Sequence, residues 1–383
     1  MSTDAPPSTA TFGHGIAHDP SLDALLATEV VTAGVARAVS AGHARRTTAG
    51  WQLAVGAAGE TSPGCPTQPE TPFDLASVTK PVTALAVARL AHAGQLGLDQ
   101  TLQSLLPLIA GTPSADVRLE LLLAHRAGLL AHLELFAPLQ RRRCVNRASA
   151  LCAAARGRAA ENPGAAPEAG FAPVYSDLGY ILLGASLECV AGSPLDVVLR
   201  EQVCAPLGLD IGSAAQWLGR DSDFVARVAP TENVAFRGGT LRGVVHDENA
   251  WALSGHGASG HAGLFGSIGS VLRLGAAVLD CLDGQSEFLP PSVVGQLVRP
   301  RPGGSLRAGF DGCASRGSSA GSLAGPQTFG HLGFTGTSLW CDPDRMAVTA
   351  VLTNRVHPTR KHIAIRQARP RIHDALWSRI DDV

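Results

Sequence analysis

The sequence predicts an α+β fold, in which an antiparallel sheet built from the N- and C-terminal segments is flanked by helices and interrupted by a mostly helical insertion. Strand-like patterns occur near the two ends of the chain, over about 35–59 and 336–354. Between them, over 97–250, helical segments alternate with loops rich in Gly and Pro. At 383 residues the chain is long enough to bury the large core that such a fold requires.

The N-terminal part is expected to begin with a flexible leader, residues 1–20. Asp19 or Ser21 can cap a first helix, because leucines and valines recur at helical spacing directly afterwards. Two strands with glycine turns are expected over 35–59, followed by a loop rich in Pro, Gly and Thr over 61–72.

Helical patterns dominate the middle of the chain. A helix is predicted from Ser77 to Leu96, with Gly94 near its C-terminal end. A strongly apolar helix is predicted over 180–191, and Gly192 follows it as a helix stop.

The C-terminal part returns to strands. A helix is expected over 271–282, and two strands over 336–341 and 346–354 flank a turn at 342–345, a pattern typical of a hairpin. A last helix is expected over about 359–380.

These patterns predict one discontinuous unit. Residues 21–90 and 255–383 would form the sheet domain, and residues 91–254 would form the helical domain. A ligand cleft is expected between the two, where binding sites form preferentially.

Composition limits the kinds of molecule that the chain is expected to bind and the compartment in which it is expected to occur. The net charge of −1 gives no electrostatic basis for binding nucleic acid or an anionic membrane. The first residues lack the features of a secretory signal, and no apolar stretch approaches the roughly 18 residues of a membrane span. The eight cysteines stand singly, without a CxxC pair, as expected of free thiols in a reducing compartment. We therefore expect a cytoplasmic protein.

Ser77 and Lys80 form the first candidate catalytic motif. The chain has only two lysines, and Lys80 lies three positions after Ser77, which places both side chains on one helix face. A lysine can act as the base for a serine nucleophile if burial and a nearby positive potential lower its pKa. The alternative is an ordinary helix-capping serine beside a solvated lysine.

Two further clusters carry polar groups suited to catalysis. Both tyrosines of the chain fall within 175–180, and Tyr175 is placed in a loop at a helix start, where a phenol can relay a proton. Glycines at 330, 333 and 336 flank His331 and would let a ligand approach an edge strand closely. Taken singly, a packed tyrosine and a structural histidine are the commoner interpretations.

Together, Ser77-x-x-Lys80, Tyr175-x-Asp177 and His331-x-Gly333 resemble the motifs of the penicillin-recognising serine enzymes. The chain is most similar to their branch of class C β-lactamases, D-alanyl-D-alanine carboxypeptidases and esterases. The resemblance extends from about Val35 to Pro358 and implies a β-lactamase/transpeptidase-like fold.

The resemblance also implies a role for each residue of the site. Ser77 would be the acylated nucleophile, with Lys80 and Tyr175 as its base system and His331 assisting. The backbone N–H groups of Ser77 and Phe334 would form the oxyanion hole. Gly333, Leu332, Asp177 and Arg355 are the remaining candidate contacts to the substrate. No cofactor is required by this chemistry.

Three positions depart from the usual motifs. Asp177 stands where the family commonly has Asn, His331 stands in place of Lys, and Leu332 in place of Thr or Ser. The last two changes remove a cation and a hydroxyl from the place where a penicillin carboxylate usually binds, so the sequence favours an ester or a neutral amide as substrate. Arg355 could still bind such a carboxylate.

Other functions stay open at this stage. A true β-lactamase, a D-alanyl-D-alanine carboxypeptidase, an acyltransferase and a non-catalytic binding protein that retains the fold are the alternatives to an esterase-like hydrolase. In each case the partner is a small-molecule ester, amide or β-lactam, and the sequence does not predict an oligomeric state. A metal site is not expected, because the spacing of His246, Asp247, His256 and His261 matches no helical ligand pair.

Overall fold

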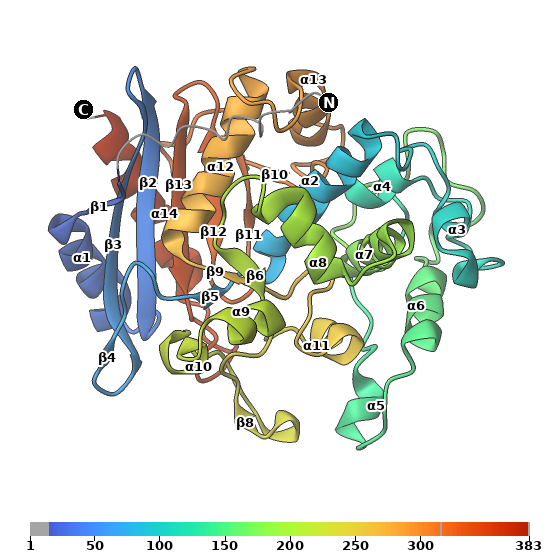
Figure 1. Ribbon diagram of the computed structural model, residues 1–383, viewed down its shortest axis with the longest axis horizontal. Coiled ribbons are helices and arrows are strands. Elements are labelled where there is room, and N and C mark those ends of the chain that lie inside the picture. Colours follow the sequence, from blue (N-terminus) through green and yellow to red (C-terminus); the bar gives the residue numbers. More distant parts are fainter. Residues whose placement is uncertain (1–14, 315, 382–383) are drawn as a thin grey trace, which may run out of the picture.

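The computed structural model describes residues 15–314 and 316–381, and within them the largest element is an eight-stranded sheet (Figure 1). The strand order is β1, β3, β2, β13, β12, β11, β10, and β4 pairs with β3 outside this path. The strands are β1 (Ala17–His18), β2 (Ala38–Thr47), β3 (Gly50–Ser62), β4 (Cys65–Pro66), β10 (Asp311–Gly312), β11 (Phe329–Leu332), β12 (Ser338–Asp342) and β13 (Ala347–Thr353). All neighbours are antiparallel except β1 and β3, which are parallel. The predicted antiparallel sheet is therefore mixed at one edge.

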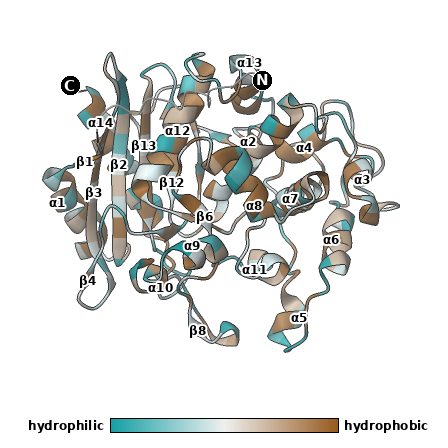
Figure 2. Cartoon of the chain, viewed as in Figure 1, coloured by the Kyte–Doolittle hydropathy of each residue, from teal (hydrophilic) through white to brown (hydrophobic). Residues whose placement is uncertain are grey.

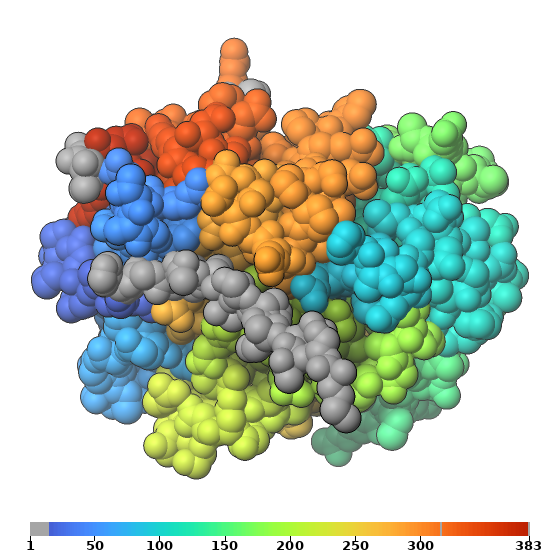
Figure 3. All heavy atoms as spheres, turned by 45° about the horizontal axis from the view of Figure 1, so that its top comes forward, coloured from blue at the N-terminus to red at the C-terminus, as the bar shows by residue number. Residues whose placement is uncertain are grey.

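The two ends of the chain build this sheet together, as predicted. β13 pairs with β2 along the whole length of β13, with Val351 opposite Ala41. Each of these strands also belongs to a hairpin, one closing at Thr47 and Gly50 and the other at Asp342 and Ala347. Figure 3 shows blue N-terminal and red C-terminal atoms side by side at the left of the molecule and cyan atoms of the middle of the chain at the right.

Helices cover both faces of the sheet. The helices are α1 (Pro20–Leu26), α2 (Thr79–His92), α3 (Leu102–Leu105), α4 (Leu119–Leu123), α5 (Ala137–Gln140), α6 (Arg147–Arg156), α7 (Asp177–Ala191), α8 (Leu195–Leu199), α9 (Ala214–Arg220), α10 (Phe224–Arg227), α11 (Glu248–Ser254), α12 (Ile268–Leu282), α13 (Pro291–Val298) and α14 (Ile365–Asp381). α12 packs on one face, and α1 and α14 pack on the other. Successive residues of β13 alternate between the two cores, since Ala350 and Leu352 join the α12 side and Val351 joins the α14 side. Figure 2 shows hydrophobic colour on the central strands and on α8, and hydrophilic colour at loop tips.

The N-terminal ends of α2 and α7 are the parts of the helical layer that position the site. α2 follows a short 3-10 turn (Ala76–Val78) and is buried on nearly all sides. α7 begins after Ser176, whose hydroxyl accepts a bond from the N–H of Gly179, and ends at Gly192 in the left-handed conformation (φ +64°). The predicted apolar helix over 180–191 is thus confirmed, with three more residues at its start.

A smaller sheet joins the two parts that the sequence divides into domains. β9 (Leu264–Gly266) pairs with β5 (Phe73–Asp74) and with β6 (Ile211–Ser213), and β6 comes from the segment assigned to the helical domain. A separate ribbon pairs β7 (Asn233–Val234) with β8 (Gly239–Thr240). The division at residues 91 and 254 stays a prediction.

Two boundaries differ from expectation. Of the predicted leader, residues 1–14 lie outside the described residues, while Ala17 and His18 pair with β3. The last helix begins at Ile365 instead of near 359, because Glu232 accepts a hydrogen bond from the N–H of Arg360 at 2.8 Å and holds the preceding segment as a loop.

Within the part of the chain that the structure describes, no single helix is long and apolar enough to cross a membrane. One bent pair, Asp177–Ala191 with Leu195–Cys204, meets the requirement by length and composition alone, with an angle of 81° between its two parts.

Candidate active site

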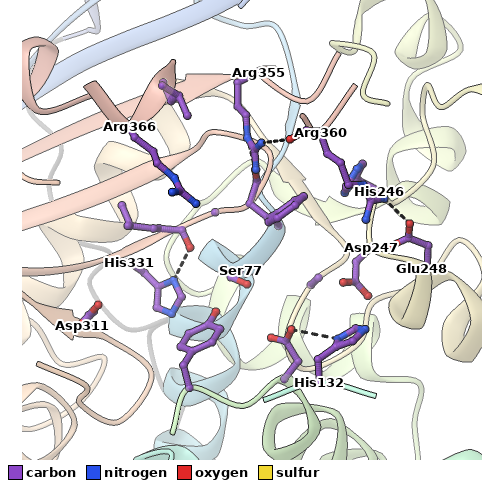
Figure 4. A pocket seen from close by; sticks show the side chains of 18 of the residues that line it. Ser77, His132, His246, Asp247, Glu248, Asp311, His331, Arg355, Arg360 and Arg366 are labelled. Atoms are coloured by element: carbon purple, nitrogen blue, oxygen red, sulfur yellow. Dashed lines mark hydrogen bonds and ion pairs between the residues drawn. The ribbon is translucent and has the colours of Figure 1, made fainter. Parts of the chain in front are cut away.

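The predicted site residues converge on one cleft (Figure 4). Its volume is about 710 Å³, and its walls come from the start of α2, the start of α7, β11 with the loop after it, and the segment leading into α14. The predicted residues that line it are Ser77, Tyr175, Asp177, His331, Leu332, Gly333, Phe334 and Arg355. Lys80 is fully buried behind Ser77.

Ser77 follows a strained turn. Ala76 has φ +47°, a left-handed conformation that residues with a Cβ rarely adopt. Asp74 holds it, because Oδ1 of Asp74 accepts a hydrogen bond from the N–H of Ala76 at 2.8 Å and Oδ2 accepts one from the N–H of His246 at 2.6 Å. The turn presents the Ser77 side chain to the cleft at the N-terminal end of the helix.

Lys80 connects the polar groups of the site. Its Nζ donates to Oγ of Ser77 at 2.9 Å, to the phenol oxygen of Tyr175 at 2.7 Å and to Oδ1 of Asp177 at 2.7 Å. A longer contact of 3.4 Å reaches the carbonyl of His261. The structure therefore brings together the three residues that the motifs predict to act as nucleophile and base system.

Asp177 determines the charge of this group. Burial opposes a charge on Lys80, but the Asp177 carboxylate outweighs it and raises the pKa of Lys80 above its ordinary value. Burial also opposes a charge on Asp177, yet Lys80 and the ring of His132 hold its pKa far below the usual range. The lowered lysine pKa on which the sequence argument depends is therefore wrong for the free protein, because an aspartate occupies the position where the family commonly has Asn.

Tyr175 is a neutral phenol whose ring stacks on a histidine. Burial raises its pKa, and Lys80 compensates only in part. Its ring stacks on His125 with 4.8 Å between ring centres. Nδ1 of His125 accepts a hydrogen bond from the N–H of Ser176 at 3.0 Å, which fixes the ring next to the start of α7.

His331 is buried and uncharged. Burial and the charge of Lys80 lower its pKa to about 3. Its Nδ1 lies 2.8 Å from the carbonyl of Leu332, and because a carbonyl only accepts, Nδ1 carries the proton and Nε2 is left as an acceptor. The ring centre is 5.9 Å from that of Tyr175. Leu332 adds no polar group, so β11 carries no cation at this point.

The loop after β11 is bonded to the Ser77 turn. Thr335 Oγ1 donates to the carbonyl of Asp74 at 2.7 Å, and Thr337 Oγ1 donates to the carbonyl of Leu75 at 2.9 Å. A Cβ at Gly333 would lie 1.9 Å from Oγ1 of Thr337 and 2.6 Å from the Leu75 carbonyl, so only glycine fits. These contacts set the distance between the two backbone segments that the resemblance assigns to the oxyanion hole.

Arg355 and Phe334 form the rim beside this loop. Phe334 is 50% exposed, and the guanidinium of Arg355 lies 4.4 Å from its ring centre. Nε of Arg355 donates to the carbonyl of Phe334 at 2.8 Å, and Nη1 donates to the carbonyls of Arg360 and His362 at 2.8 and 3.0 Å.

The histidines considered as metal ligands have other partners. His246 hydrogen-bonds Glu232 at 3.1 Å, and His261 hydrogen-bonds Asp247 at 2.8 Å. Over residues 15–314 and 316–381, no group of three or more His, Cys, Asp or Glu side chains could hold a metal ion.

Sequence reasoning missed four residues that support the site: Asp74, His125, Thr335 and Thr337. Asp74 and His125 lie inside stretches that carry the family resemblance, but their contacts with His246 and Ser176 join residues far apart in the chain. The two threonines could have been found from the sequence, because they follow the His331-x-Gly333 motif, two and four positions after Gly333.

Comparisons with known proteins identify the family. Residues 22–372 match the family model described as Beta-lactamase. A protein of Escherichia coli (strain K12) named "Putative D-alanyl-D-alanine carboxypeptidase" is 31% identical over 316 residues, which cover 75% of this chain and 70% of that protein.

Solved structures show the same fold at lower identity. EstCE1, described as a hydrolase with promiscuous acyltransferase activity, superimposes with a TM-score of 0.68 at 22% identity, covering 92% of this chain and 98% of its own. A class C β-lactamase from Rhodobacter sphaeroides superimposes with a TM-score of 0.67 at 18% identity, covering 94% and 99%. The predicted α+β, β-lactamase-like architecture is therefore confirmed.

Proposed function

The chain belongs to the beta-lactamase family, and from this membership and the geometry of the cleft we propose that it is a serine hydrolase that cleaves an ester or amide through an acyl-enzyme. The observation that carries the proposal is the contact of Lys80 Nζ with both Ser77 Oγ, at 2.9 Å, and the Tyr175 phenol, at 2.7 Å. A nucleophile with a base within hydrogen-bond reach, oriented by a third group, is the arrangement that covalent catalysis needs.

Acylation begins when Lys80 has lost a proton. Oγ of Ser77 attacks the substrate carbonyl carbon, and its proton passes to the neutral amine of Lys80. The Tyr175 hydroxyl gives its proton to the leaving alkoxide or amine, and Lys80 returns a proton to the phenolate. The backbone N–H groups of Ser77 and Phe334 stabilise the oxyanion, and such a donor contributes roughly 3 kcal/mol.

Deacylation uses water in place of Ser77. With the leaving group gone, a water molecule in the cleft attacks the acyl carbon, and Tyr175 together with Lys80 takes its proton. Nε2 of His331 is an acceptor near Tyr175 and can hold the same water in position. Collapse of the oxyanion breaks the bond to Oγ, and Ser77 recovers its proton from the base system.

We propose that esters are better substrates than β-lactams. A β-lactam ring system holds its carboxylate close to the scissile bond, next to β11, where His331 is neutral and Leu332 has no hydroxyl. Such a substrate loses a charge-assisted hydrogen bond, a contribution of about 1.5–3 kcal/mol. A short ester has no such requirement and still uses the oxyanion hole.

The test compares kcat/KM for p-nitrophenyl butyrate and nitrocefin, with the Ser77→Ala protein as the control. We expect the ester to be cleaved at least about tenfold more efficiently and both activities to vanish in the control. Nitrocefin as the better substrate would refute the substrate assignment alone. Ester hydrolysis that survives in Ser77→Ala would refute the serine hydrolase itself.

A D-alanyl-D-alanine carboxypeptidase is the second candidate, favoured by the name of the Escherichia coli relative. Release of D-alanine from a peptide ending in D-alanyl-D-alanine, measured under the same conditions, distinguishes the two. A kcat/KM for the peptide above that for the ester would favour the peptidase.

A further inference from the structure

The wall of the cleft formed by the end of β13 and the start of α14 carries unbalanced positive charge. Arg355, Arg366 and Arg369 all line the cleft. None of the three forms an ion pair with a carboxylate of residues 15–314 and 316–381. Figure 4 shows Arg355 and Arg366 on the same side of Ser77, away from His132.

Arg369 is the most informative of the three. Its side chain is buried, with 7% of the residue exposed, and its only hydrogen bond among the described residues is a long one of 3.5 Å from Nη2 to the carbonyl of Thr337. Its Nε has no partner within the same part of the chain. A buried guanidinium without an anion costs several kcal/mol, so such groups are normally paired or positioned to bind a ligand.

The arginines also destabilise one another. Burial lowers the pKa of Arg369 to about 10, and Arg355 contributes to the lowering. Burial likewise lowers the pKa of Arg355, with Arg366 as the next cause. A negative group placed among them would relieve this repulsion and would supply the acceptor that Nε of Arg369 lacks among the described residues.

Most other charged side chains of the cleft form ion pairs with residues of the protein. Arg360, on the same wall, forms ion pairs with Glu232 and Glu248. Asp177 is paired with Lys80, Asp247 with His261 and Glu248 with Arg360. Two acids, Glu134 and Asp311, form no ion pair with any residue that the structure describes; they belong to other parts of the lining, and burial raises the pKa of Asp311.

We propose that Arg366 and Arg369, with Arg355, form an anion subsite that binds a carboxylate or phosphate group of the substrate while its ester or amide lies at Ser77. This inference rests on the proposed function and names its substrate class: a flexible ester or amide whose anionic group reaches beyond β11 to α14. A substrate carboxylate that has no polar partner on β11 would therefore bind the arginines of α14.

The test uses matched esters with and without a charge. Mono-p-nitrophenyl glutarate is compared with p-nitrophenyl butyrate for a charge in the acyl part, and m-carboxyphenyl butyrate with phenyl butyrate for a charge in the leaving group. A p-nitrophenyl phosphonobutyrate distinguishes phosphate-like from carboxylate recognition. We expect at least one anionic ester to exceed its neutral match in kcat/KM by about tenfold or more.

Variants locate the effect on α14. In Arg366→Gln, at an exposed position that folding tolerates, the ratio of kcat/KM for the anionic over the neutral ester should fall to near one. Arg369→Gln should lower the same ratio, and Arg371→Gln should keep it, because Arg371 lies on the same helix but pairs with Glu29 outside the cleft. Equal kcat/KM within every pair, or a preference that persists in Arg366→Gln, would overturn the subsite.

A binding measurement separates this inference from the proposed function. Calorimetry on the Ser77→Ala protein should show tighter binding of the anionic ester than of its neutral match, and Arg366→Gln in that background should remove the difference. If the difference is found but the protein with Ser77 cleaves no ester, the subsite stands and the hydrolase fails. If esters are cleaved without any difference in binding, the hydrolase stands and the subsite fails.

Discussion

Asp177 is the single residue that most changes the chemistry of the site relative to the usual motif. Its carboxylate pairs with Lys80 at 2.7 Å and keeps the lysine charged in the free protein, so the base must lose a proton before acylation. A charged, fully buried lysine is also anchored by this pair, which keeps Nζ between Ser77 and Tyr175. In the proposed mechanism the same residue thus orients the base and raises the pH at which the base works.

We expect Asp177→Asn to move the acidic limb of the kcat/KM–pH profile to lower pH. In the native protein the pKa of Lys80 is raised, so activity is lost as pH falls through it; without the carboxylate, the largest of the causes that oppose burial is removed and that pKa falls. Initial rates with p-nitrophenyl butyrate across pH give the profile. His132→Gln is the matched control, since His132 contacts Asp177 from the exposed side and has a raised pKa of its own. A limb that moves in His132→Gln and stays in Asp177→Asn would show that the histidine titrates instead.

At this scale the sequence predicted which side chains meet in the cleft but not their protonation. Ser77, Lys80 and Tyr175 could be found because lysine and tyrosine are scarce and each falls in a short motif. The left-handed conformation of Ala76 could not, because it depends on the Asp74 carboxylate, which also accepts a hydrogen bond from the N–H of His246, 172 positions later in the chain. The raised lysine pKa follows from distances that no linear motif contains.

At the scale of elements, hydrogen bonds and close packing hold the loop after β11 against the turn before α2. Thr335 and Thr337 donate to two successive carbonyls of that turn, Asp74 and Leu75, and Gly333 lies against it without room for a side chain. The alignment of the two backbone N–H groups in the predicted oxyanion hole therefore depends on close packing of glycine and threonine.

We expect Gly333→Ala to lower kcat/KM by at least about tenfold, because the new Cβ would displace the loop from the Leu75 carbonyl and misplace one oxyanion donor. It should also destabilise the fold by about 1–3 kcal/mol through overpacking, measured by urea unfolding. Gly295→Ala is the control: it lies in α13 with no atom within 4 Å of the new Cβ, and alanine favours a helix. Native activity in Gly333→Ala would contradict the role of the loop.

Elements with strong local patterns were predicted well. The C-terminal hairpin, the apolar helix ending at Gly192 and the helix near 271–282 all occur, with ends displaced by three residues or fewer. The start of α14 was not predicted, because the segment before it is held by Glu232, 128 positions earlier in the chain. The same loop brings the arginines of α14 to the cleft, which no local pattern indicates.

At the scale of the whole molecule, the site exists only when both ends of the chain have come together. β2 and β13 join the N-terminal and C-terminal halves, and β11, three strands from β2, then lies against the turn that carries Ser77. Tyr175, in the loop before α7, and Asp177, the first residue of α7, come from a third part of the chain. Strand patterns at both ends of the sequence predict this sheet. The relative orientation of the three motifs depends on packing on both sides of the sheet, which the patterns do not predict.

The central claim is that Ser77 forms the acyl-enzyme, and intact-mass spectrometry tests it most directly. Incubation with a fluorophosphonate, and separately with a slowly hydrolysed ester, should add one adduct of the reagent's acyl or phosphonyl mass to the native protein. Peptide mapping should place it on Ser77, and the Ser77→Ala protein should stay unmodified under the same conditions. A single adduct of equal yield in Ser77→Ala, or one mapped to another residue of the native protein, would contradict the account.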